Sequence, residues 1–290
     1  MSATLHNFAQ LNGLLDRERD PSAWRELLAG SVPDAQALMT PLEPVRRLAT
    51  APPRSLDDDL LYELFALSTV DDLLVSTPAL PTGDRDAFFS ALGFEPFSAT
   101  VFSPLTCEIV EVSNADIAPE SGIRVERVHW SGLSYGELVF ARSGVSIRCH
   151  PSLDIVQGIA DKSMLHFTNH RPVRAVNDLS HGWGHNSRWS TDFHRNYQVR
   201  GIAFYNVDAE FDIGVPNARL QWPGRPPHAL DLAQARELLM HRGFVRTPRF
   251  KDEWPYGWRM AVSDSGRAWP LDEADLLPFD AALRRAGLVA

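Results

Sequence analysis

The stretch Tyr135–Cys149 reads YGELVFARSGVSIRC and decides the fold class. It contains two runs rich in β-branched and aromatic residues, Tyr135–Ala141 and Val145–Cys149, separated by Arg142–Gly144. This composition favours strands, and such a short connection predicts a hairpin. We therefore expect an antiparallel sheet in this part of the chain.

Further strands are expected on both sides of this stretch. Cys107–Val112 and Ile123–Trp130 have the same composition and are bounded by Gly, Ser, Asn or Pro. Gly201–Asp208, GIAFYNVD, is typical of a buried strand, and Trp258–Val262 predicts one more.

Helical patterns flank these strands. Before them, helices are expected around residues 5–15, from Asp20-Pro21 to Gly30, over residues 55–67 and over Asp84–Leu92; after them, over Asp231–Arg242 and Phe279–Arg285. Asp57–Asp59 imitates a metal site, but in the first turn of a helix carboxylates offset the helix dipole, so we interpret it as a cap.

Together these elements predict an α+β fold, with an N-terminal helical layer followed by a mostly antiparallel sheet and C-terminal helices packed on it. We expect residues 1–100 to form a helical subdomain and residues 101–290 an α+β domain. One continuous domain over residues 1–290 is the alternative.

The composition, with 44% hydrophobic and 22% charged residues, is that of a soluble globular protein. There is no apolar run of about 18 residues and no signal-peptide pattern, so we expect a cytoplasmic protein without a membrane partner. Arginine outnumbers lysine 26 to 2, which is typical of a GC-rich bacterial genome. Cys107 and Cys149 form no C-x-x-C motif, and we expect two reduced thiols in the core.

The distribution of charge along the chain indicates which kind of ligand to expect. The net charge of −9 argues against a nucleic-acid partner. Residues 1–100 carry 15 acids and 7 bases, whereas residues 166–200 carry 2 acids and 5 bases. A local basic region on an acidic protein favours a small anionic ligand such as a carboxylate or a phosphate.

The segment Ser180–Tyr197, SHGWGHNSRWSTDFHRNY, lies inside this basic region, and we call it the polar segment. Five of the ten histidines of the chain fall within residues 166–194. A segment so rich in polar groups buries little apolar surface, so we expect it to form a ligand or catalytic site.

Two kinds of chemistry fit the polar segment. His181, His185 and His194, with Asp192, could hold a divalent metal such as zinc. His181 and His185 have i, i+4 spacing, but the glycines between them disfavour a helix and no H-E-x-x-H motif is present. Alternatively, the same three histidines and Asp192 act as catalytic acids and bases without a metal.

Other side chains of the polar segment would bind the substrate. These are Trp183, Asn186, Ser187, Arg188, Trp189, Arg195 and Tyr197. A third interpretation is purely structural: the tryptophans fill a hydrophobic gap and the polar side chains satisfy the backbone of an ordered loop.

We therefore expect a soluble bacterial enzyme of the hydrolase or lyase type that acts on a small anionic substrate by histidine–aspartate acid–base or metal-assisted chemistry. The alternative is a non-catalytic binding protein. It would be either a toxin immunity protein, whose acidic N-terminal half faces a basic protein partner, or a self-resistance protein that sequesters a ligand.

Overall fold

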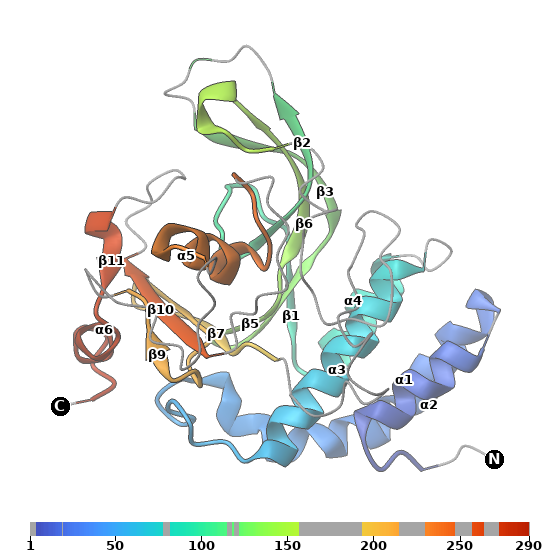
Figure 1. Ribbon diagram of the computed structural model, residues 1–290. Helices are drawn as coiled ribbons and strands as arrows, with labels where there is room; N and C mark the ends of the chain where they lie inside the picture. Colours follow the sequence, from blue (N-terminus) through green and yellow to red (C-terminus); the bar gives the residue numbers. More distant parts are fainter. Residues whose placement is uncertain are drawn as a thin grey trace.

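The structure is a computed structural model that describes residues 4–18, 20–77, 82–114, 118, 122–156, 193–214, 230–246, 257–263 and 273–289. In these residues, helices precede the strands and further helices follow, so the α+β class is confirmed (Figure 1). No helix in the described ranges combines the length and apolar character needed to cross a membrane. The division of the chain near residue 100 stays a prediction.

The N-terminal layer consists of α1 (Phe8–Arg17), α2 (Pro21–Met39), the 3-10 helix η1 (Thr40–Arg46), α3 (Asp58–Ser76) and α4 (Thr82–Ala91). The Asp57 side chain accepts a hydrogen bond of 2.8 Å from the backbone N–H of Leu60 at the start of α3. Asp58 and Asp59 lie in the first turn, which confirms that this acidic triplet is a helix cap.

The prediction that the second helix ends at Gly30 was wrong, because α2 continues for nine residues to Met39 and passes through Pro33. Glycine and proline both disfavour a helix interior, by about 1 and 3 kcal/mol respectively. The second half of α2 places Ala35 and Met39 in the core, where both are buried. Burial of this apolar face therefore outweighs the local preference of the backbone.

The strands form two sheets. The larger sheet has the order β1 (Glu95–Phe97), β4 (Gly132–Tyr135), β5 (Leu138–Ala141), β7 (Asn196–Val199), β8 (Ile202–Tyr205), β10 (Trp258–Ser263) and β11 (Leu276–Leu277), all antiparallel, with β9 (Phe211–Asp212) pairing parallel to β10. In the smaller sheet, β6 (Ser143–Cys149) lies between β2 (Cys107–Asn114), which is parallel to it, and β3 (Ile123–Trp130), which is antiparallel. Figure 1 shows this smaller sheet rising from the body of the molecule.

The hairpin predicted at Arg142–Gly144 was wrong, because β5 and β6 lie in different sheets. The hairpin lies earlier, at Gly136 and Glu137, which divide the predicted strand into β4 and β5. Gly136 has a φ of +63°, and a Cβ there would lie 2.6 Å from the carbonyl oxygen of Arg46, so only glycine fits. At Arg142 the chain instead crosses from the larger sheet to the smaller one.

The larger sheet is buried on both faces, as β8 shows. Ile202 and Phe204 pack with the N-terminal helices and α6 (Phe279–Arg285). Ala203 and Tyr205 point the other way, into a second core formed with α5 (Leu232–His241) and the smaller sheet. Figure 1 shows α5 and the N-terminal helices on opposite sides of β5, β7 and β10.

The second core also contains Cys107 and Cys149, which are both buried and free, as the sequence predicts. Burial raises the pKa of both thiols. These cysteines therefore serve as small apolar core residues.

Candidate functional site

The structure describes only the last five residues of the polar segment, Phe193–Tyr197, which lead into β7. Most of the predicted site residues lie outside the described residues: His181, Trp183, His185, Asn186, Ser187, Arg188, Trp189 and Asp192. His194, Arg195 and Tyr197 are described, and all three are buried. The catalytic and substrate-binding roles assigned to these residues stay predictions.

Arg195 uses all five of its N–H groups within the protein. Nε and Nη2 each donate a hydrogen bond to the carboxylate of Asp208. Nη1 donates to the carbonyl oxygen of Ala51 at 2.8 Å and to the hydroxyl of Tyr197 at 3.0 Å. The second N–H of Nη2 donates to the carbonyl oxygen of Pro52 at 3.2 Å. A guanidinium has five donors and no acceptor, so this set is complete. A ligand that bound Arg195 would have to replace one of these bonds.

Tyr197 extends this network towards the helical layer. Its hydroxyl accepts the bond from Arg195 and donates one of 3.0 Å to the carbonyl oxygen of Val45. Burial raises the pKa of Tyr197 to about 12, because the phenolate would lose its hydration. Tyr197 thus fixes the end of the polar segment to η1, and Arg195 fixes it to the segment that follows η1.

His194 lies between Phe193 and Arg195, and only 5% of its surface is exposed. Across the ranges that the structure describes, no three His, Cys, Asp or Glu side chains come close enough to hold a metal ion. The other two predicted metal ligands, His181 and His185, lie outside these ranges. The divalent-metal hypothesis therefore stays a prediction.

The end of the polar segment reaches a cavity at the junction of the helical layer and the two sheets. The cavity has a volume of about 30 Å³, which is room for about one or two water-sized groups. Its described lining comes from six places in the chain: Ser68 and Asp71 on α3, Glu108 on β2, Trp130 on β3, Val139–Arg142 on and after β5, Phe193 and Asn196 of the polar segment, and His241 and Arg242 at the end of α5. We call it the junction cavity.

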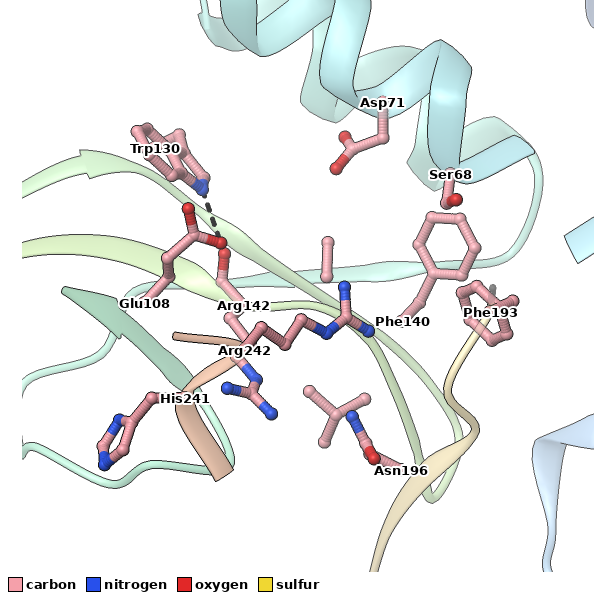
Figure 2. Close-up of a pocket in the computed structure, with 12 residues that line it drawn as sticks. Ser68, Asp71, Glu108, Trp130, Phe140, Arg142, Phe193, Asn196, His241 and Arg242 are labelled. Carbon is pink, nitrogen blue, oxygen red and sulfur yellow. Dashed lines mark hydrogen bonds between the residues drawn. The ribbon is translucent and has the colours of Figure 1, made fainter. Parts of the chain in front are cut away.

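Two arginines line the junction cavity. Figure 2 shows the side chains of Arg142 and Arg242 between α3, with Ser68 and Asp71, and Asn196 on the opposite side. Arg142 is 8% exposed, and its Nη1 donates to the carbonyl oxygen of Met240 in the last turn of α5. A guanidinium group held in this way is a planar donor suited to carboxylates and phosphates.

The local backbone explains how Arg142 and Arg242 come together. Arg142 is the residue at which the chain leaves β5 for β6, and its carbonyl oxygen accepts a bond of 3.0 Å from Nε1 of Trp130. Arg242 is the C-cap of α5 and has a φ of +53°, so the chain turns away from the helix there. Arg142 therefore lies at the crossing between the two sheets and Arg242 at the turn after α5, and both line the junction cavity.

The charge of Asp71 is already balanced from outside the cavity. Its Oδ1 accepts a bond of 2.6 Å from Nε of Arg85, which is 1% exposed. Nη1 of Arg85 also donates to Asp86 and to the carbonyl oxygen and hydroxyl of Ser131. Besides Asp71, the charged side chains of the described lining are Arg142, Arg242 and Glu108, which have further contacts within the protein and together carry an excess of one positive charge. This charge is complementary to an anion.

His241 and Asn196 add further polar groups to the lining. His241 is 6% exposed and stacks on Phe102, with ring centroids 6.4 Å apart and planes inclined by 14°. Oδ1 of Asn196 accepts a bond of 2.9 Å from the backbone N–H of Asn206, which orients its amide. Asn196, the first residue of β7, therefore places the end of the polar segment in the cavity wall.

Sequence reasoning placed the candidate site in the polar segment and did not find the arginines and the histidine on the other side of the cavity. Arg142 lay in the supposed hairpin turn, and His241 and Arg242 lay at the expected end of a helix. No local pattern marks them, because only the crossing between the sheets and the turn after α5 bring them together.

Comparisons with known proteins show no similarity: no family model, no curated protein and no solved structure matches the chain.

Proposed function

We propose that the protein binds a small carboxylate or phosphate compound in the junction cavity and acts on it as an enzyme. The observation that carries this proposal is the meeting, in one cavity, of Arg142 and Arg242 with Phe193 and Asn196, the described end of the polar segment. The arginines would bind the anionic group. The histidines and the aspartate of the polar segment would transfer protons or hold a divalent metal.

The division of labour in this proposal follows from chemistry. Arginine remains charged at all physiological pH values, so it binds an anion but does not exchange protons. Histidine changes its charge near neutral pH and is the side chain suited to acid–base work. The hydrolase or lyase type of reaction, the cytoplasmic location and the bacterial source remain predictions from the sequence.

Thermal unfolding in the presence of small anions tests the binding step. Phosphate, pyrophosphate, acetate, oxalate and citrate form a suitable first panel. An anion present at about 100 times its Kd stabilises the folded state by about 2.7 kcal/mol, which raises the Tm by roughly 5 °C for a chain of this size. We expect the shift for at least one of these compounds, and its absence for the entire panel would count against the proposal.

Substitution of Arg242 localises the binding. R242Q removes the charge at the cavity and should abolish the shift. R246Q is the matched control, because Arg246 follows four residues later, is exposed and does not line the cavity. A shift that survives in R242Q, or that disappears equally in both variants, would show that the anion binds elsewhere.

A non-catalytic binding protein is the second candidate. It is favoured by the carboxylates that the helical layer exposes, which include Asp57, Asp58 and Asp59 at the start of α3. A basic protein partner would be complementary to such charges. An anion that binds in the junction cavity but is recovered unchanged after prolonged incubation with the protein and added Zn²⁺ or Mn²⁺ would favour this candidate over the enzyme.

A further inference from the structure

A second group of reactive side chains lies on the smaller sheet, outside the junction cavity. The hydroxyl of Ser146 on β6 lies 2.6 Å from Nε2 of His129 on β3 and 2.7 Å from Oε2 of Glu111 on β2. Nε2 of His129 and Oε2 of Glu111 are 3.8 Å apart. Each strand of the sheet thus contributes one member of a compact serine, histidine and glutamate group.

Irregular pairing of the strands produces this group. The register of β2 against β6 shifts between Ile109 and Glu111, and that of β3 against β6 shifts between Val125 and Arg127 and again between Val128 and Trp130. The last shift leaves His129 without a partner residue in the ladder. Bulges turn side chains away from the regular alternation and are enriched near active sites.

The three side chains lie on the face of the smaller sheet that points away from the second core. Val145 and Ile147, the neighbours of Ser146 on β6, are fully buried in that core, so Ser146 points to the other face. The Glu111 side chain is 64% exposed, whereas that of His129 is 7% exposed. Ser146 itself is 7% exposed, and the exposed Glu111 side chain marks the side from which a reagent would approach it.

The number of hydrogen bonds that each group can donate determines which of the three donates and which accepts. An ionised carboxylate only accepts hydrogen bonds, so the single hydroxyl proton of Ser146 is donated to Glu111. The Ser146 oxygen then accepts its bond from Nε2–H of His129. Burial lowers the pKa of His129, which favours the neutral ring. In that ring, the bond to the Ser146 oxygen requires the proton on Nε2.

We propose that Ser146 is a nucleophile for activated esters, with Glu111 as its general base and His129 holding the hydroxyl in place. In the reaction, Oγ of Ser146 forms a bond to the acyl carbon while the bond from that carbon to the leaving alcohol breaks. The hydroxyl proton passes to Oε2 of Glu111 and from there to the departing alkoxide. A water molecule then attacks the acyl carbon while Oε2 of Glu111 takes one of its protons. The bond from that carbon to Oγ of Ser146 breaks, the proton passes from Glu111 to Oγ, and the carboxylic acid is released.

A fluorophosphonate reagent tests this proposal directly, because it attacks serine hydroxyls only when a base activates them. Oγ of Ser146 would bond to phosphorus, fluoride would leave, and Glu111 would take the proton. Peptide mapping by mass spectrometry of the full-length protein should locate the adduct on Ser146. An absence of adduct at Ser146 after prolonged exposure would overturn the proposal.

Ser152 is an internal control for the effect of a neighbouring histidine on the reactivity of a serine. Ser152 lies 2.7 Å from Nδ1 of His150 on the exposed turn after β6 and has no carboxylate at its hydroxyl among the bonds described. If a nearby imidazole alone activated serine, Ser152 would react as fast as Ser146. We expect Ser152 to remain unlabelled, and equal labelling of the two serines would contradict the role of Glu111.

Two substitutions separate the roles within the group. E111Q should slow labelling at least about 100-fold, since general-base catalysis contributes about 10²–10⁴-fold. Because the Glu111 side chain is exposed, this variant should keep the fold, which circular dichroism will verify. An unchanged rate would refute the base assignment. H129Q keeps an N–H donor and should retain most of the labelling rate of Ser146. H129L has no such donor and should lose most of that rate. Equal labelling rates in both variants would exclude a positioning role for His129.

Discussion

Replacing Arg195 with methionine is expected to lower the free energy of unfolding by about 3 kcal/mol. The variant leaves the carbonyl oxygens of Ala51 and Pro52, the carboxylate of Asp208 and the hydroxyl of Tyr197 without the five donors of the guanidinium. Removing one partner of a buried ion pair costs about 3–5 kcal/mol. The lower end applies, because the Asp208 side chain is 18% exposed and keeps a bond of 2.8 Å from the backbone N–H of Arg54.

Denaturant unfolding measures this loss, and methionine is chosen because it keeps the apolar packing of the arginine stem. Arg25 provides the matched control: it pairs with Asp84 at 2.8 Å, but its side chain is 65% exposed, so R25M should leave the stability close to that of the wild type. If R195M were as stable as R25M, Arg195 would not be a structural anchor. If R195M in addition lost anion binding, the role in substrate binding predicted from the sequence would gain support.

Three further predictions follow from the same structure. Because burial raises the pKa of Tyr197 from 10 to about 12, the unfolded state loses its phenolic proton first as the pH rises. The wild type should therefore lose about 1 kcal/mol of stability through this group between pH 9 and pH 11, and Y197F should lack this component; identical pH profiles of the two proteins would exclude it. A Cβ at Gly144 would lie 2.2 Å from the Trp130 ring, so G144A should destabilise the protein by about 1–3 kcal/mol in denaturant unfolding, and a variant of wild-type stability would show that the ring moves freely. H181A and D192N should each abolish ligand binding or turnover while changing the free energy of unfolding by no more than roughly 1–2 kcal/mol. If the protein binds a metal, elemental analysis should show that H181A has lost it. A large loss of stability in either variant would instead favour the structural interpretation of the polar segment.

The sequence predicted the elements whose signals are local. The strand Ile123–Trp130 and the helix Phe279–Arg285 have the predicted bounds. Asp231 starts α5 because its side chain and that of Gln234 form a capping box, a signal that lies within four residues. Such elements could be predicted because each depends on its own residues.

The pairing of strands could not be predicted in the same way. Ser143 and Gly144 have turn chemistry, yet they continue into β6, and Gly144 is required because the Trp130 ring lies against it. The contact that decides this comes from a strand 14 residues earlier in the chain. The same reason hid half of the candidate site, because Arg142 and Arg242 meet only through the tertiary fold.

The most direct test of the central claim is a double-mutant cycle measured by isothermal titration calorimetry with the anion that gives the largest thermal shift. The proteins are the wild type, R242Q, H181A and the combined variant. If the polar segment and the junction cavity form one site, the two substitutions should be coupled by at least about 1 kcal/mol in binding free energy. Effects that add to within about 0.5 kcal/mol, or binding that neither substitution changes, would contradict the account.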